Sequence, residues 1–330
     1  MKKLILITSI IIVVLTACKE NKKEIGTDTN VQDSTAIVLK TYAELSIAEG
    51  GKWKERVYEG GTSFKNVDEL WVPKRHTDHS WYLRYEGPGW ESNKVGYRLY
   101  LDWRNAIDIF GKITDSIVLD QVGQDGFDSY HEKQKWGQDI LKVGKALGLG
   151  SYGRLVADSV HHFQNVDSTY IKVNNNKKAS GVNIRYHGWA TEDIKTDLDV
   201  SLSIKPDSRM TRTVLSTSKS VEGLVTGIVK SEGVDLIVDN AGNSEWGYIA
   251  TYGEQTLVPD NLGMVIFYKK DEVISLVDGA YDHLLLFKPT EESITYRFGA
   301  VWEGEKNGVK TKEGFLSYLK DELNNLNSVY

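Results

Sequence analysis

The segment TDLDVSLSIKP, residues 196–206, alternates apolar and polar side chains along most of its length. Every second position is aliphatic, at Leu198, Val200, Leu202 and Ile204. Successive side chains of a β-strand point to opposite faces, so the pattern predicts a strand with one face in a core and the other in water. The lysine and proline that follow indicate a turn.

Similar alternating segments recur along the chain, for example at residues 96–103, 181–189, 263–270 and 293–302. The composition of 9 Trp, 17 Tyr, 30 Gly and only 5 Pro suits aromatic-lined sheets joined by glycine turns. A dozen or so short strands favour antiparallel sheets packed face to face. Without a fixed-period repeat or an interior linker, the sequence predicts one all-β domain over residues 38–330, a large antiparallel β-sandwich.

Two segments have helical rather than strand-like spacing. Residues 130–147 place apolar side chains three or four positions apart, at Trp136, Ile140, Val143 and Leu147. Residues 310–326 form one apolar face from Phe315, Leu316, Leu319 and Leu323. We therefore expect one or two short helices beside the sheets.

The N-terminus, MKKLILITSIIIVVLTAC, has the pattern of a lipoprotein signal sequence. Two lysines precede an apolar run, and residues 15–18 read Leu-Thr-Ala-Cys. We expect a signal peptide over residues 1–17, a lipid on Cys18 and a polar tether over residues 18–37. The protein would then be anchored to the bacterial envelope, most simply the outer membrane. Cys18 is the single cysteine, so neither a disulfide nor a thiolate nucleophile is expected.

The stretch GLGSYG, residues 148–153, fits the G-x-G-x-x-G pattern of dinucleotide-binding loops. That pattern has physical meaning only between a strand and a following helix. Here the predicted helix comes before the glycines and an extended segment comes after them. We expect no nucleotide cofactor, and the net charge of −6 also argues against a nucleic-acid partner.

His131 begins a polar series on the predicted helix. Lys135, Gln138, Lys142 and Lys145 follow at helical spacing, which would place them on one face. Such a face suits a carboxylated or sulfated ligand, and the alternative is a solvated basic surface. His131 and its neighbour Tyr130 are the candidate proton donors of this segment.

The segment RYHGW, residues 185–189, combines groups that suit a sugar acid. Arg185 can grip a carboxylate with two hydrogen bonds, Trp189 can stack on a pyranose ring, and Tyr186 and His187 can move protons. The alternative is an aromatic core strand with two exposed polar residues.

Residues 84–112 are the richest run of candidate groups. Trp90 and Glu91 follow a Gly-Pro-Gly turn, Arg98 lies on the polar face of the next strand, and Trp103 and Arg104 close it. Upstream, His76 and His79 have the spacing of a metal-binding pair, although loop histidines of this kind are often solvated.

The motifs GPGWESNKVGYRLYLDWRNAIDIFGK, YHEKQKWGQDILKVGKALGLGSYG, RYHGWA and NLGMVIFY resemble a family long described as a domain of unknown function. The family is found in gene clusters of polysaccharide-degrading bacteria and includes the ulvan oligosaccharide dehydratase. The resemblance covers about residue 40 to the C-terminus. It implies a galactose-mutarotase-like sandwich and a lyase that removes water across C4–C5 of a non-reducing-end uronic acid, acting on an anionic oligosaccharide.

The residue roles follow from the chemistry of that reaction. Abstraction of the proton α to a carboxylate requires a base, an acid for the leaving hydroxyl and a cation or strong donors at the carboxylate. We expect His187 or Tyr186 as base and His131 with Tyr130 as acid. Binding residues would be Arg98, Arg104, Arg185, Lys142, His79, Trp90, Trp103 and Trp189. A divalent metal on His76, His79 and Glu91 is an alternative neutraliser of the carboxylate.

Two other classes fit the same residues. A uronic-acid hydrolase needs a carboxylate pair astride the bond, for which Asp78, Glu91, Asp102 and Asp128 are candidates. A non-catalytic glycan-binding lipoprotein would use the same tryptophans and arginines without a tuned proton donor.

Overall fold

The computed structural model describes residues 39–127, 129–242 and 244–328. The signal peptide, the tether, Cys18 and Asp128 lie outside these residues. The described part consists of antiparallel sheets with one α-helix, which confirms the all-β sandwich class.

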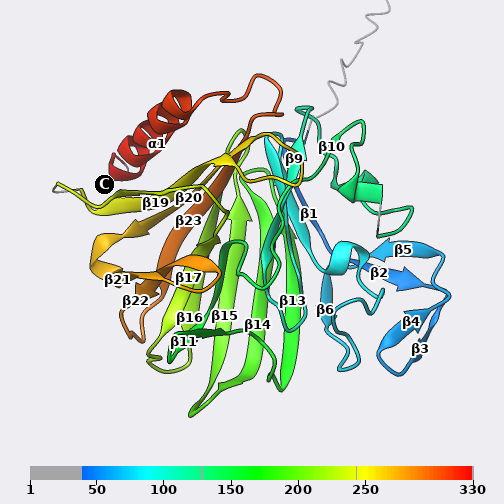
Figure 1. Cartoon of the computed structure of the whole chain (residues 1–330). Helices are drawn as coiled ribbons and strands as arrows, with labels where there is room; N and C mark the ends of the chain where they lie inside the picture. Colours follow the sequence, from blue (N-terminus) through cyan, green and yellow to red (C-terminus); the bar gives the residue numbers. More distant parts are fainter. Residues whose placement is uncertain (1–38, 128, 243, 329–330) are drawn as a thin grey trace, which may run out of the picture. The chain divides into compact units, whose positions relative to one another are not determined.

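A nine-stranded sheet runs through the whole domain (Figure 1). Its order is β18 (Leu236–Asp239), β19 (Trp246–Glu254), β20 (Asn261–Lys269), β23 (Ile294–Trp302), β16 (Met210–Thr217), β15 (Ile194–Ile204), β14 (Ser180–Thr191), β13 (Ser168–Asn175) and β6 (Glu69–Trp71). The strand β15 contains the segment quoted first. Its four aliphatic side chains are buried and the residues between them are partly exposed, as the alternation predicts.

Two five-stranded sheets cover one face of the nine-stranded sheet. The first contains β1 (Thr41–Glu44), β7 (Gly89–Ser92), β8 (Val95–Leu99), β9 (Ile107–Lys112) and β10 (Gly137–Asp139). The second contains β12 (Ser159–His161), β11 (Leu149–Val156), β17 (Leu224–Val229), β22 (Asp282–Phe287) and β21 (Val273–Asp278). The first packs on β13–β15 and the second on β20 and β23, enclosing one large apolar core.

The two smaller sheets meet at a single parallel bridge between Ile107 and Gly148. The Ile107 N–H donates to the Leu147 carbonyl over 3.0 Å, and the Val229 N–H donates to the Gly148 carbonyl over 2.8 Å. This seam joins β9 to β11, so the two sheets act as one layer opposite the nine-stranded sheet.

Short elements complete the described chain. Two two-stranded sheets pair β2 (Ser46–Glu49) with β5 (Ser63–Asn66) and, in the hairpin between these strands, β3 (Lys52–Lys54) with β4 (Val57–Glu59). The single-turn 3-10 helices are η1 (Arg84–Glu86), η2 (Leu119–Gln121), η3 (Ser129–His131) and η4 (Lys270–Glu272).

The C-terminal helix α1 (Lys312–Asn327) confirms the second helix prediction. The Thr311 side chain caps it by accepting from the Gly314 N–H over 3.1 Å. Phe315 and Leu319 are buried against β19 and β20, on the face of the large sheet opposite the smaller sheets (Figure 1). Leu316 is instead 39% exposed. Within the described residues, no helix is long and apolar enough to cross a membrane.

The predicted helix over residues 130–147 is wrong. The segment holds only η3 and β10, and the rest is irregular. Gly137 and Gly144 have φ of 140° and 60°, which interrupts helical backbone. Trp136, Ile140, Val143 and Leu147 are nevertheless buried. Their spacing therefore indicated which side chains enter the core, but it did not indicate a helix. The predicted basic face does not form, and Gln138 is buried in β10.

The glycines of GLGSYG serve close packing. A Cβ on Gly148 would lie 1.9 Å from the Ile107 carbonyl oxygen, and one on Gly150 would lie 2.3 Å from the Phe298 ring. Both glycines have positive φ, 76° and 72°. The strand β11 begins within the motif, and a loop, not the predicted helix, precedes it.

Replacing Gly148 by alanine tests whether this close approach is needed. Gly233 is a matched control because its φ of 74° is nearly the same while no atom lies within 4 Å of its Cβ position. Gly233→Ala should cost about 1–2 kcal/mol for the left-handed backbone, measured by urea unfolding. Gly148→Ala should cost clearly more, since the seam must also open. Equal losses would contradict a steric role.

Candidate functional site

Three of the predicted site residues are enclosed in the core. Tyr186 donates to Asn105 Oδ1 over 2.5 Å, and Trp90 Nε1 donates to Thr211 Oγ1 over 2.8 Å. Trp189 Nε1 donates to the His162 carbonyl over 2.9 Å. Because Trp90 and Trp189 are buried, the sugar stacking predicted for them is wrong, whereas Tyr186 lines a separate small cavity and its proton-transfer role stays a prediction.

Arg98 is the centre of a buried charge network on the outer side of the first five-stranded sheet. Its guanidinium donates to Asp108 over 2.8 Å, to Asp139 over 2.6 Å and to the Tyr130 hydroxyl over 3.0 Å. Its side chain is 1% exposed. The prediction that Arg98 holds the carboxylate of a substrate is therefore wrong, because protein carboxylates already occupy it.

Burial is the largest cause of the pKa shifts of the carboxyl and hydroxyl groups in this network. Burial, followed by the charge of Asp139, raises the pKa of Asp108 to about 7. Burial also raises the pKa of Tyr130 to about 12, so this hydroxyl is a poor acid at neutral pH. His131 reaches the network from the surface, with Nδ1 3.1 Å from Asp139 and 44% of its side chain exposed.

His131 and His187 lie on different faces of the molecule. Tyr186 is buried in the core, so the alternation of β14 turns His187 to the solvent side of the nine-stranded sheet. Tyr97 and Leu99 are buried in the same core, so Arg98 faces the outer side of the opposite sheet, and His131 lies there with it. The prediction that the two histidines share one site is wrong, because both layers of the sandwich separate them.

The predicted metal set is not assembled either. Glu91 is buried in an ion pair with Lys112 and accepts the Val118 and Leu119 N–H groups over 2.8 Å. His76 is also buried, which lowers its pKa to about 4, and its Nδ1 lies 2.7 Å from Ser80 Oγ.

A different trio brings metal-ligand atoms together. Asp78, His79 and Glu86 each offer a ligand atom within 4.8 Å of the others. Arg104 already pairs with Asp78 over 3.1 Å and with Glu86 over 2.8 Å. The guanidinium therefore supplies the positive charge at this cluster, and its side chain is not free to bind a substrate anion.

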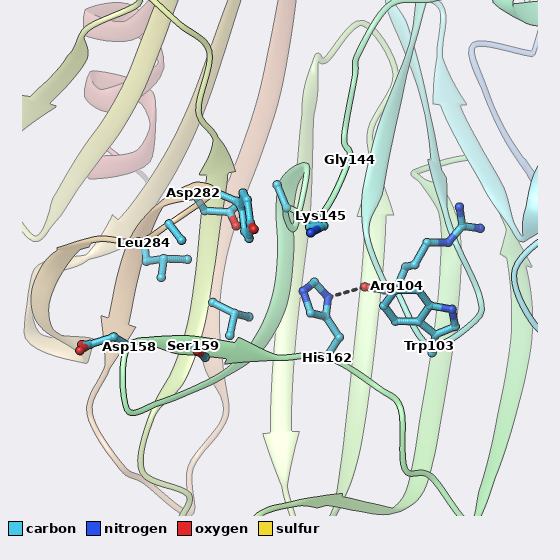
Figure 2. A pocket seen from close by; sticks show the side chains of 14 residues that line it. Trp103, Arg104, Gly144, Lys145, Asp158, Ser159, His162, Asp282 and Leu284 are labelled. Carbon is cyan, nitrogen blue, oxygen red and sulfur yellow. Dashed lines mark hydrogen bonds between the residues drawn. The ribbon is translucent and has the colours of Figure 1, made fainter.

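A cavity of about 320 Å³ lies where the seam between the smaller sheets meets the β21–β22 turn. Figure 2 shows the side chains around it. The lining comes from the turn before β9, the loop before β11, the strand β12 and the β21–β22 turn, and consists of Trp103, Arg104, Gly144, Lys145, Ala146, Asp158, Ser159, Val160, His162, Gly279, Ala280, Tyr281, Asp282 and Leu284. Of the predicted residues, it contains Trp103 and Arg104; Lys142 does not line it.

His162 lies in the middle of this group (Figure 2). Its Nδ1 donates to the Arg104 carbonyl over 2.6 Å, which leaves the lone pair of the neutral ring on Nε2. Burial lowers the pKa of His162, partly offset by hydrogen bonds to the backbone of Arg104 and Lys145. The imidazole is therefore neutral at neutral pH, with Nδ1 on the Arg104 carbonyl and the ring also in contact with the Lys145 backbone.

Lys145 supplies the positive charge of the cavity. Its ammonium lies 5.8 Å from the centre of the Tyr281 ring, and no carboxylate among the described residues pairs with it. The Arg104 side chain, in contrast, points away from His162 in Figure 2, toward its own carboxylates. Lys145 is thus the cation available to an anionic ligand here.

Asp282 is the buried acidic group of the cavity wall, and Asp158 is an exposed one. Its Oδ1 accepts the Leu147 N–H over 2.9 Å, and its residue is 3% exposed. Burial raises the pKa of Asp282 to about 7, against the opposing effects of that hydrogen bond and of Lys230. Near neutral pH the carboxyl group therefore carries a proton part of the time.

Two exposed aromatic side chains, Trp103 and Tyr281, lie at the rim of the cavity. Trp103 is 43% exposed and Tyr281 is 50% exposed. Trp103 was among the binding residues predicted from the sequence, whereas Tyr281, His162 and Asp282 were not. No local spacing links them, because the segments meet only through the sheet pairing; the histidine pair at residues 161–162 was the one visible signal.

The comparisons with known proteins identify the family. Residues 9–329 match the family described as "Domain of unknown function (DUF4861)", and the chain belongs to it. A search of curated proteins finds no match.

Two solved structures are distantly similar, both of the α-N-acetylgalactosaminidase NagBb from Bifidobacterium bifidum. The quadruple mutant aligns at 9% identity with a TM-score of 0.34, and the GalNAc complex at 10% with 0.35. The alignments cover 69% and 70% of this chain and 38% of each NagBb chain. The chain thus spans well under half the length of these structures.

The titration of Asp282 predicts a pH-dependent stability. Its pKa is about 7 in the folded protein, against an ordinary value of 3.8 for an aspartate, so between these pH values the native state binds a proton that the unfolded state releases. The free energy of unfolding should fall as pH rises through this window, by up to about 1.4 kcal/mol per pH unit from this group. Asp282→Asn should remove that part of the slope and keep the acceptor for Leu147.

Asp278 provides the control, since it is exposed on the neighbouring strand and its pKa is lowered by Lys230. Urea unfolding of Asp278→Asn should retain the slope between pH 4 and 7. An unchanged slope in Asp282→Asn would contradict the protonated state of Asp282.

Proposed function

We propose that the protein is a lyase that dehydrates a uronic acid at the non-reducing end of an oligosaccharide, with the cavity as its active site. The observation that carries the proposal is the meeting of Lys145, His162 and Asp282 on one cavity wall. An available cation, a neutral imidazole and a carboxyl group with a pKa near 7 are the three groups that elimination next to a carboxylate requires.

Lys145 takes the role of carboxylate neutraliser in this proposal. When the proton on C5 is removed, negative charge accumulates on the adjacent carboxylate oxygens. An ammonium group beside those oxygens stabilises the transition state more than the ground state. Trp103 and Tyr281, exposed at the rim, offer rings on which the sugar can stack.

His162 and Asp282 take the two proton-transfer roles. Nε2 of His162 accepts the C5 proton, the C4–C5 double bond forms and the C4–O bond breaks. Asp282 gives its proton to the leaving hydroxyl, so that water departs. The product carries a 4,5-unsaturated uronyl residue and has the same chain length as the substrate.

The motif resemblance supports the choice of substrate. The family that includes the ulvan oligosaccharide dehydratase shares the long motifs around residues 84–112 and 130–153. In this chain those two runs supply Trp103, Arg104 and Lys145 to the cavity. We therefore propose ulvan-type oligosaccharides, in which uronic acids are joined to sulfated sugars, as the substrate class.

Replacing His162 tests the proposal directly. His162→Ala should lower turnover of a uronic-acid-terminated oligosaccharide by about 10²–10⁴-fold, the usual contribution of a positioned base. His161→Ala is the matched control, because His161 lies beside Glu192 at 3.7 Å and does not line the cavity. Turnover is followed by the ultraviolet absorbance of the conjugated product.

The same assay separates the alternatives. Shorter chains without new absorbance would indicate a hydrolase, and binding without any product would indicate a non-catalytic glycan-binding protein. Either result, or full activity in His162→Ala with a correct circular dichroism spectrum, would overturn the dehydratase proposal at this site.

We further propose that Cys18 is lipidated and holds the domain at the cell envelope, on the basis of the lipobox sequence. Metabolic labelling with a fatty acid should mark the wild-type protein. Cys18→Ala should abolish the label and leave the precursor uncleaved. A labelled Cys18→Ala protein, or an unlabelled wild type, would contradict the anchor.

A further inference from the structure

The solvent side of the nine-stranded sheet carries a shallow groove across β13, β14, β15 and β16. Its volume is about 450 Å³. Its polar lining includes Lys172, Asn183, Arg185, Asp199, Ser201 and Ser216. This groove is separate from the cavity, because the cavity belongs to the layer on the opposite side of the core.

The strand alternation fixes the direction of these side chains. Ile171, Ile184 and Val200 are buried in the core, so the residues beside them in sequence point to solvent. Arg185 and Asp199 are partners in the register of β14 and β15. The groove is therefore a row of outward-facing side chains on a rigid sheet.

An aromatic platform lies beside the groove. Trp71, on the edge strand β6, is 59% exposed. Its ring centre lies 5.0 Å from that of Tyr170 and 5.8 Å from that of His187, and the planes of Trp71 and His187 differ by 17°. Tyr170 also lines the groove, so the platform and the groove are continuous.

The groove offers hydrogen-bonding groups along its length. Arg185 binds Asp199 through two contacts of 2.5 and 2.6 Å, and about half of each side chain is exposed. Lys172 is exposed on the neighbouring strand. Paired donors and acceptors suit sugar hydroxyls, the ammonium suits a carboxylate, and an exposed indole suits the apolar face of a pyranose.

We propose that this face is a second glycan-binding site, which takes an extended stretch of a uronic-acid polysaccharide. One sugar ring stacks on Trp71 and the following units lie over Arg185 and Lys172. The site binds the polymer without transforming it. The choice of a uronic-acid chain rests on the proposed function, whereas the binding itself does not require catalysis.

Affinity electrophoresis in gels containing soluble ulvan tests the proposal. The parent protein carries His162→Ala, so that the polymer is not consumed. We expect retardation of this parent and an apparent Kd that rises about tenfold in Trp71→Ala and in Arg185→Ala. Trp81→Ala is the matched control: Trp81 is 37% exposed and packs on Phe127, away from the groove.

Three results would overturn the proposal: no retardation of the parent, equal retardation of the parent and both groove variants, or equal retardation of the parent by dextran. Turnover of a short oligosaccharide by Trp71→Ala with His162 intact should match the wild type. If the wild type shows no turnover, the proposed function fails, but the retardation assay still decides the groove.

Discussion

The contact between Ile107 and Gly148 is the constraint on which the candidate site depends. It joins the two smaller sheets, and it leaves no room for a side chain at residue 148. Because the bridge is parallel, the turn that carries Trp103 and the loop that carries Lys145 lie at the same end of this seam, just before Ile107 and Gly148. Leu147, next to Gly148, donates to Asp282 and thereby draws the β21–β22 turn to the same place. One backbone approach thus assembles four distant segments around a cavity.

The cationic side chains near the candidate site fall into two classes, those that pair with carboxylates of the protein and those that can pair with a ligand. Arg98 and Arg104 are surrounded by carboxylates of the protein, and a buried guanidinium without such partners would be strongly unfavourable. Their positive charge is therefore already neutralised. Lys145, without a carboxylate partner among the described residues, keeps its charge for a ligand. This contrast, more than residue type, decides which of the three cations is available to an anionic ligand.

The sequence predicted the sandwich and the C-terminal helix, because alternation and amphipathic spacing report local burial. It failed over residues 130–147, where Trp136 and Ile140 are buried at helical spacing but Gly137 and Gly144 break the helix. It also placed His131 and His187 together, since nothing local reveals on which face of a sandwich a residue lies. His162 and Asp282, 120 positions apart in sequence, meet only through the pairing of β11, β17 and β22.

The central claim is that the cavity removes water from a uronic acid without breaking the chain. Mass spectrometry of the products formed in water enriched in heavy oxygen tests this claim most directly. We predict a single product lighter than the substrate by one water, with no label incorporated, and the loss of this product in Lys145→Ala. Shorter chains that carry one heavy oxygen at the new reducing end would contradict it.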